Sequence, residues 1–290
     1  MVLKDLLHKS RTIRIMYHYP GSIIKAYKDK QFIKGCMEKV KNTPDKIKHF
    51  KNAHKGERCF IVCNGPSLTA QDLDKISREY SFGSNRIYNM FPYTKWRPTY
   101  YCEADPYVSK VIDKKDMDSI LNGCNASFLN LRCCDDYPEG AKENSNVYFY
   151  YIKPIFGVES IKNETRLPDF SEDFSVYAYS GLTITYEMIQ LAAYMGFKEM
   201  YIIGCDNSYK HTVKTGRLTE NKEMETNYPK EMGEPDNRIP QPTFNPKTTF
   251  AYQAAKEYAD KHGIKIYNAT RGGKLEVFER KTLEEVLGIE

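Results

Sequence analysis

The sequence contains no uninterrupted apolar run of about 18 residues, the minimum for a helix that crosses a membrane. Its first residues, MVLKDLLHKSRTIRIMYHYPG, also lack the continuous apolar stretch and the small-residue cleavage site of a secretory signal. We therefore expect a cytoplasmic protein without a transmembrane helix. Neither the G-x-x-x-x-G-K-[ST] motif nor the G-x-G-x-x-G motif occurs, which excludes the two best-known glycine-rich phosphate loops.

The cysteines form no C-x-x-C pair, the spacing that structural zinc sites commonly use. Disulfides persist mainly in oxidising compartments. We therefore interpret the eight cysteines as reduced thiols, and we expect no metal site and no bound cofactor. They are Cys36, Cys59, Cys63, Cys102, Cys124, Cys133, Cys134 and Cys205.

Positive charge is concentrated at the N-terminus. Residues 1–57 hold fourteen Lys and Arg against five Asp and Glu, a net charge of +9, whereas the rest of the chain sums to −4. Segment 1–56 is predicted to be a basic helical arm, broken at Pro20-Gly21 and near Pro44. It fits either an anionic surface, such as the inner membrane, or a solvated face packed on the body. No nucleic-acid module is recognisable, so we expect no nucleic-acid partner, and a homo-oligomer stays open.

Apolar and amphipathic runs alternate from residue 57 onward. The pattern predicts an α/β fold, a modified Rossmann-like domain over 57–290 with a mostly parallel sheet and flanking helices. Ligands of such sheets bind beyond the carboxyl ends of the strands. The predicted strands are 58–63, 80–88, 97–108, 146–156, 198–206 and 264–270, with a helix and a strand within 118–133, helices at 68–80, 181–194 and 248–263, and a strand or turn and a short helix within 275–289.

The loop Asn64-Gly65-Pro66-Ser67 follows the first predicted strand directly. Glycine permits backbone conformations closed to other residues and lets a ligand approach closely. The next helix would point its free N–H groups and its positive dipole end at a bound anion. The loop therefore predicts a phosphate site; the alternative is an ordinary turn in which Ser67 or Thr69 caps the helix.

A second junction of this kind is Ser180-Gly181, which precedes the helix 181–194. Thr183 and Thr185 follow in its first turn, and Gly196 is placed to end the helix. Two helix N-termini with small hydroxyl residues would embrace one diphosphate or phosphodiester from two sides. Simple capping is again the alternative.

Carboxylates follow two of the predicted strands. Glu103 and Asp105 end the third strand, and Asp206-Asn207 follow the buried strand 198–206. Such groups suit a divalent ion on a nucleotide diphosphate, or a general base.

The polar stretch 207–246 shows no clear secondary structure, which is typical of a lid-like insert. Its basic residues and His211 would lie near a phosphate when the lid closes. A solvated loop is the alternative.

Four segments occur together in the order found in a known group of proteins: CNGPSL, SFGSNRIY, YSGLTITYEMIQLAAYMGFKEMYIIGCDNSY and GIKIYNATRGGKLEVF. Through them the chain resembles, over about residues 57–280, the bacterial family 42 sialyltransferases and their relatives. These relatives include the flagellin-glycosylation and 6-hydroxymethylpterin-diphosphokinase-like domains. The Ser-Gly helix followed by GFKEMYIIGCD is the most specific part of the likeness.

The resemblance implies a fold that binds a CMP-sugar donor and transfers the sugar to a glycan or lipid-linked oligosaccharide acceptor. Asn64, Asn85 and Ser180 match positions that lie around the donor sugar and its phosphate. Asp206 matches the Asp after the buried strand, and Tyr209 lies close to the position of a phosphate-contacting Tyr.

The chain departs from the family at two positions. The family's catalytic His falls at about Pro246, and its Arg before the Ser-Gly helix is replaced by Tyr177. The candidates for the general base are therefore Asp105 and His211.

The leading hypothesis is a glycosyltransferase of bacterial surface-polysaccharide synthesis that uses a CMP-activated sialic-acid-like or other ulosonic sugar. The alternative is an ATP-dependent diphosphokinase, in which Glu103, Asp105 and Asp206 would hold Mg²⁺. A nucleotide-sugar-binding scaffold without a base is the third hypothesis. The residues predicted to bind the donor or nucleotide are Asn64, Gly65, Pro66, Ser67, Asn85, Ser180, Gly181, Asp206, Asn207 and Tyr209.

Overall fold

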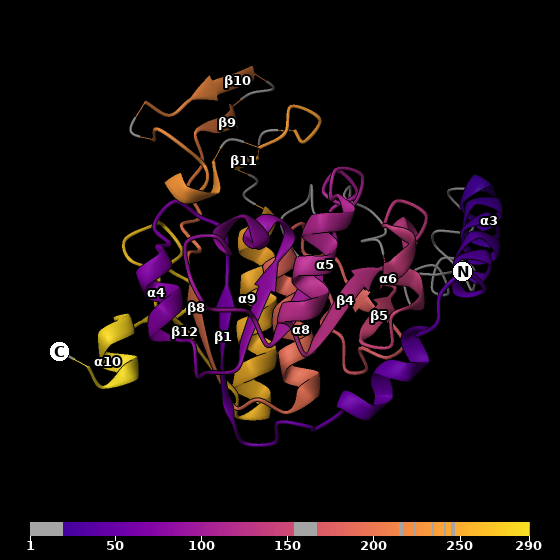
Figure 1. Ribbon diagram of the computed structural model, residues 1–290, viewed down its shortest axis with the longest axis horizontal. Coiled ribbons are helices and arrows are strands. Elements are labelled where there is room, and N and C mark those ends of the chain that lie inside the picture. Colours follow the sequence, from indigo (N-terminus) through magenta and orange to yellow (C-terminus); the bar gives the residue numbers. More distant parts are fainter. Residues whose placement is uncertain are drawn as a thin grey trace, which may run out of the picture. The chain divides into compact units, whose positions relative to one another are not determined.

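Eight strands pair into one sheet, and every adjacent pair runs parallel (Figure 1). The computed structural model describes residues 20–153, 167–214, 217–222, 224–233, 235–240, 242–244 and 247–289. The strand order is β13-β12-β8-β1-β2-β3-β4-β5. The strands are β1 (Arg58–Val62), β2 (Ser81–Ser84), β3 (Tyr100–Glu103), β4 (Ala126–Asn130), β5 (Val147–Tyr150), β8 (Glu199–Ile203), β12 (Lys265–Asn268) and β13 (Glu279–Arg280).

The strand order reverses once, between β1 and β8. The chain adds β2 to β5 on one side of β1 and then returns to place β8, β12 and β13 on the other side. In open parallel sheets, such a switch point is where loops diverge and leave a crevice for a ligand. The α/β fold class and the parallel sheet predicted from the sequence are confirmed.

Helices cover both faces of the sheet (Figure 1). α8 and α9 supply the core residues of one face, and α5 packs on β4 from the other. No helix in the described part of the chain is both long and apolar enough to span a membrane. The helices of this region are α4 (Ala70–Lys75), α5 (Lys114–Gly123), α6 (Glu139–Glu143), α8 (Ile184–Met195), α9 (Lys247–His262) and α10 (Leu283–Leu287), with 3-10 turns η1 (Pro44–Phe50), η2 (Asn85–Met90), η3 (Leu131–Cys133) and η4 (Lys230–Met232).

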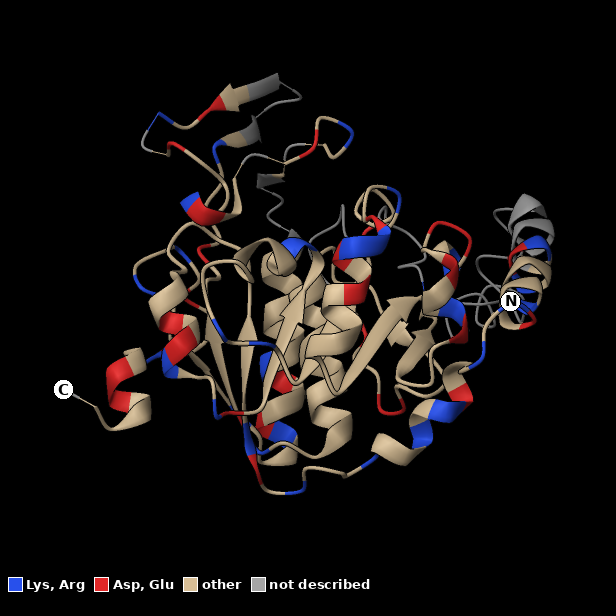
Figure 2. Cartoon of the chain, in the orientation of Figure 1, with Lys and Arg blue, Asp and Glu red and all other residues tan. Residues whose placement is uncertain are grey.

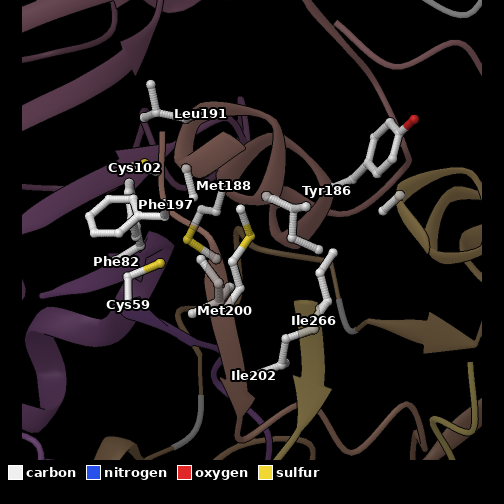
Figure 3. Packing of buried hydrophobic residues seen from close by; sticks show 14 of the residues in the cluster. Cys59, Phe82, Cys102, Tyr186, Met188, Leu191, Phe197, Met200, Ile202 and Ile266 are labelled. Carbon is white, nitrogen blue, oxygen red and sulfur yellow. The ribbon is translucent and has the colours of Figure 1, made fainter. Parts of the chain in front are cut away.

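The core lies between the sheet and α8. Met188 and Leu191 of α8 pack with Met200 and Ile202 of β8 and with Phe82 of β2 (Figure 3). All five side chains are fully buried, and each such burial stabilises the fold by about 1.5–3 kcal/mol. Charged residues gather on helices and loops, while the strands carry few of them (Figure 2). All eight cysteines lie in the described part of the chain, where they are buried and form no disulfide with one another.

The helix ends follow the predicted signals in part. Thr183 caps α8, and Gly196 ends it in the left-handed region at φ 91°. α4 is shorter than predicted, because Thr69 caps it in a box with Asp72 and the helix stops at Ile76.

The chain forms two compact units, Met1–Val40 and Lys41–Glu290. In the first unit the described residues form the helix α3 (Pro20–Met37), which begins at a proline, as its missing N–H allows. The sequence predicts an arm that extends to residue 56, but residues 41–56 belong with the sheet. Ile47 is fully buried there, and the N–H of His54 donates to the carbonyl of Met195 at 2.8 Å.

The insert is not the structureless loop that the sequence predicts. β9 (His211–Lys214) pairs antiparallel with β10 (Arg217–Glu220) and parallel with β11 (Thr243–Phe244). This small sheet follows β8 and lies beyond the ends of the main strands (Figure 1). The strands are only two to four residues long, so their periodicity is too short to recognise in the sequence.

Candidate functional site

The loops after β1 and β8 are joined at the switch point. The Gly65 N–H donates to the Gly204 carbonyl at 2.8 Å. The N–H and hydroxyl of Ser67 both donate to Oδ2 of Asp206, at 3.3 and 2.9 Å. The structure therefore brings Gly65, Ser67 and Asp206 together. Ser67 and Asp206 lie 139 residues apart in the sequence.

Asp206 accepts hydrogen bonds from the Ser67 groups that the sequence predicts would bind a phosphate. Its carboxylate is 9% exposed, and burial raises its pKa against the opposing effect of the Ser67 hydrogen bonds. Because both donors of Ser67 already bind an anion, they are not free for a second one. Asp206 is itself an acceptor, and it suits a ligand hydroxyl or amino group.

Gly65 is required by packing within the protein. A Cβ at this position would overlap Oδ2 of Asp206 and lie 2.5 Å from the Gly204 carbonyl oxygen. Its φ is not in the positive region, so the predicted special backbone conformation is wrong. Gly65 does allow a close approach, but the group that approaches it is the Asp206 carboxylate. Pro66 connects Gly65 to Ser67.

The helix after this loop offers little to an anion. α4 has six residues, and the Thr69 side chain accepts from the Asp72 N–H while Asp72 accepts from the Thr69 N–H. Arg271 bridges the same corner, because it donates to the Ser67 carbonyl at 3.1 Å and to Asp72 at 2.8 Å. The Ser67 N–H and hydroxyl and the N–H groups of Thr69 and Asp72 are therefore already bonded within the protein, which removes them from the predicted phosphate cradle.

Two asparagines lie next to each other beyond β1 and β2. The amide of Asn64 donates to the Ser84 carbonyl at 3.0 Å, and the Tyr101 hydroxyl donates to the Asn85 carbonyl at 2.7 Å. Asn85 is in the left-handed region at φ 49°, which asparagine tolerates better than most residues. The Oδ1 atoms of Asn64 and Asn85 are buried without a hydrogen-bond partner among the described residues. Each oxygen therefore lacks the donor that a buried polar atom normally has.

Ser180 and Gly181 form a tight turn before α8. The Leu182 N–H donates to the Ser180 hydroxyl at 3.3 Å, and Leu182 adopts φ 61° while 43% exposed. A Cβ on Gly181 would lie 2.6 Å from the Tyr186 side chain, so packing again requires the glycine.

The first turn of α8 is attached to the end of β1. The Thr185 hydroxyl lies 3.2 Å from the Cys63 sulfur. α8 has twelve residues, and its N-terminus is directed to the edge where the strands end. The two junctions predicted from the sequence are thus neighbours.

The loop after β8 continues with Asn207 and Tyr209. Asn207 is in the left-handed region at φ 48°. Burial raises the pKa of Tyr209, and the nearby Cys205, Cys63, Tyr228 and Asp206 add smaller contributions in the same direction. The Tyr209 side chain therefore lies close to the switch point.

The two predicted base candidates differ in their surroundings. Asp105 lies in the loop after β3, and its Oδ1 accepts from the Tyr107 N–H at 2.8 Å. His211 begins β9, and its Nδ1 is buried without a partner among the described residues. The family's His position, at about Pro246, lies outside the described residues.

Glu103 does not face the switch point. It is fully buried, receives a hydrogen bond from the Tyr137 hydroxyl, and burial raises its pKa to about 8. Among the described residues, no three His, Cys, Asp or Glu side chains converge as a metal site. Glu103, Asp105 and Asp206 therefore do not form the three-carboxylate site that the diphosphokinase hypothesis predicts.

A cleft of about 330 Å³ opens on the α4 side of the switch point. Ser67 and Gly204 line it, together with Thr270 and Arg271 from the loop after β12. Thr270 and Arg271 are not among the site residues predicted from the sequence. They follow the carboxyl end of a predicted strand, which is the signal that selects the other loops.

The fold and site define a Rossmann-like α/β protein whose polar residues gather at the β1–β8 switch point. The chain belongs to the MptE-like family: the model described as 6-hydroxymethylpterin diphosphokinase MptE-like matches residues 34–212.

Two solved structures are similar to the chain. The Maf glycosyltransferase from Magnetospirillum magneticum AMB-1 has 14% identity and a TM-score of 0.45, with 86% of this chain and 38% of that protein covered. The sialyltransferase CstII from Campylobacter jejuni, in complex with cytidine-5'-monophosphate, has 14% identity and a TM-score of 0.45, with coverages of 78% and 85%. This chain therefore spans well under half of the Maf protein. A comparison with curated proteins finds no match.

Proposed function

We propose that the protein is a glycosyltransferase that transfers a sialic-acid-like or other ulosonic sugar from a CMP-sugar to a hydroxyl of a glycan or lipid-linked oligosaccharide. The observation that carries this proposal is the set of acceptors around the switch point, two of which are buried without a partner among the described residues. Asn64, Asn85 and Asp206 present carbonyl and carboxylate oxygens there, with the Tyr209 hydroxyl beside them. Such a surface suits a ligand rich in hydroxyl and amino groups, as a nucleoside and a sugar are.

The reaction transfers the anomeric carbon from a phosphate oxygen to the acceptor oxygen. The leaving CMP takes the electron pair of the broken C–O bond and gains negative charge on its phosphate. Groups suited to meet this charge are the N-terminus of α8 and the Tyr209 hydroxyl, because donors that are already oriented stabilise developing charge best. The acceptor's proton passes to a base, for which Asp105 and His211 are the candidates.

The family name supports a second candidate, an ATP-dependent diphosphokinase acting on a pterin-like alcohol. Mg²⁺ often binds to one or two carboxylates together with substrate phosphates. Asp206, which is buried, and Asp105, which is partly exposed, are the carboxylates at the strand ends that would take this role. Glu103 is excluded from such a site by its burial and its bond to Tyr137.

Nucleotide preference distinguishes the two functions. The experiment is calorimetric titration of the full chain with CMP, CDP, UDP, ADP and ATP, each with Mg²⁺ and with EDTA. The transferase predicts that CMP binds most tightly and that EDTA has no effect. ATP binding that requires Mg²⁺ would instead establish the diphosphokinase. Tight CMP binding without turnover of any CMP-sugar would leave a binding scaffold.

A further inference from the structure

Arg86 is the only buried Lys or Arg among the residues whose burial the structure describes. It is 5% exposed. A guanidinium keeps its charge throughout the pH range in which proteins fold. Burial of a charge is unfavourable unless other groups compensate for it. Asp236 of the insert is close enough to contribute, because Arg86 adds to the effect of Arg238 in lowering the Asp236 pKa.

The position of Arg86 is at the strand ends. It is the second residue of η2, directly after Asn85, and η2 begins where β2 ends. The preceding carbonyl, that of Ser84, accepts the hydrogen bond from Asn64. Arg86 is therefore one residue from the acceptors assigned to the donor site, and no other buried cation in the described part of the chain lies there.

The insert contacts Arg86 and η2. The guanidinium carbon lies 4.9 Å from the ring centre of Tyr228, and η4 packs against η2. Tyr228 is also close enough to Tyr209 to affect its pKa. Tyr228 thus connects the end of β2 with the end of β8, across the strand β1 that lies between them.

This arrangement leaves a guanidinium under an aromatic ring, next to the site. Arginine binds phosphate and carboxylate through planar, paired hydrogen bonds, and contact with an aromatic ring restricts the orientation of the guanidinium. We propose that Arg86 binds the anionic group of the donor, a phosphate or a sugar carboxylate, and that Tyr228 holds the guanidinium in place while the insert covers the site. This inference rests on the proposed function and adds to it the cation and the covering residue.

The test compares wild type with Arg86→Met and Arg86→Lys. The ligands are cytidine, CMP and CMP-N-acetylneuraminic acid, titrated at fixed salt. A charged hydrogen bond contributes about 1.5–3 kcal/mol, so loss of the guanidinium weakens an anion that it binds roughly 10- to 100-fold. Arg86→Lys keeps the charge without the planar pair, and we expect an intermediate loss.

The pattern of losses identifies the anionic group. If Arg86→Met weakens CMP and leaves cytidine unchanged, Arg86 binds the phosphate. If it leaves CMP unchanged and removes the extra affinity of CMP-N-acetylneuraminic acid, Arg86 binds the carboxylate. If all three ligands bind both variants as they bind wild type, the inference is wrong.

Arg97→Met is the matched control, because its guanidinium lies 4.1 Å from the Phe91 ring centre and donates to the Trp96 carbonyl away from the site. It should leave all three affinities unchanged. Equal weakening by Arg97→Met and Arg86→Met would mean a general loss of structure and would overturn the assignment.

The role of Tyr228 has its own readout, which is limited proteolysis of the insert. CMP should protect wild type, and Tyr228→Leu should lose this protection while it keeps the same melting temperature. Protection of both proteins alike would show that Tyr228 does not take part. If wild type itself binds neither CMP nor pyrophosphate, the proposed function and the inference fail together, which differs from failure of Arg86 alone.

Discussion

At the scale of single residues, the site is a set of polar residues held by hydrogen bonds to other strands and loops. Asp206 is fixed by Ser67, Asn64 by the Ser84 carbonyl, and Asn85 by Tyr101. Beside these bonds, the Oδ1 atoms of Asn64 and Asn85 are left without a partner among the described residues.

Gly65→Ala should destabilise the protein as well as disturb the site. The added Cβ would overlap Asp206 and crowd the Gly204 carbonyl, and such overpacking costs about 1–3 kcal/mol. Thermal unfolding measures the change. Gly140→Ala is the control, because a Cβ there meets nothing within 4 Å and alanine favours the helix. An unchanged melting temperature for Gly65→Ala would contradict the packing seen at the switch point.

Loss of the base should reduce turnover without reducing CMP affinity. Asp105→Asn is expected to lower the rate by roughly a hundredfold or more, the usual effect of removing a general base. His211→Ala is the companion variant, because its buried Nδ1 is without a partner among the described residues. Full activity of Asp105→Asn with an inactive His211→Ala would assign the role to the insert. Full activity of both would contradict the proposed chemistry.

Glu187 should make stability depend on pH. Burial raises its pKa to about 8, while hydrogen bonds from the N–H groups of Glu187 and Gly181 oppose the shift. The unfolded chain ionises near pH 4.5 and the folded one only near 8. Because the unfolded state alone gains charge between these values, the free energy of unfolding falls as pH rises through this window.

Glu187→Gln removes this dependence. Urea unfolding at pH 5, 6.5 and 8 should show the free energy of unfolding of the variant rising relative to that of wild type as the pH increases. Glu257→Gln, on an exposed position of α9, should follow wild type at all three values. A difference between Glu187→Gln and wild type that is the same at every pH would refute the raised pKa.

At the scale of elements, the insert and the start of α8 enclose the edge where the strands end. The insert is a small sheet of β9, β10 and β11, and η4 attaches it to η2. α8 is attached to β1 through Thr185 and Cys63. The elements that cover the site are thus connected to the strands that form it.

Replacement of residues 211–244 by a short Gly-Ser linker should leave the main sheet folded and abolish sugar transfer. The eight-stranded sheet makes its strand pairs without the insert, so circular dichroism should show little change in helix content. Retained transfer would show that the insert is not part of the active protein. Loss of folding would show that the insert also stabilises the sheet.

At the scale of the whole molecule, the two units differ in charge. Residues 1–40 carry nine Lys and Arg against three Asp and Glu, a net charge of +6 on a chain of total charge +5. Since residues 41–56 pack with the sheet, a shortened chain should begin at Lys41. Basic residues near an anionic bilayer contribute about 1 kcal/mol each, which is enough for weak attachment.

We expect the full chain to co-sediment with phosphatidylserine vesicles and the chain from Lys41 to stay in the supernatant. Phosphatidylcholine vesicles, which carry no net charge, should retain neither protein. Equal partitioning of the two chains would contradict the prediction that the arm binds a membrane. Equal CMP affinity of the two chains is the control for an intact site.

The sequence by itself determined the α/β class, the parallel order of most elements and the loops that meet at one edge. It also determined where two helices begin and end: Thr69 begins α4 and Gly196 ends α8, as predicted. These features depend on the periodicity of apolar residues and on backbone preferences, which act between neighbours in the chain. They are therefore readable without knowledge of the fold.

Only the tertiary structure decided how the site residues are used. Ser67 binds Asp206, Gly65 makes room for the same carboxylate, and Arg86 is buried under Tyr228. Each of these contacts joins segments more than a hundred residues apart. Whether a donor is free or a charge is buried depends on what the fold brings next to it, and no local pattern carries that information.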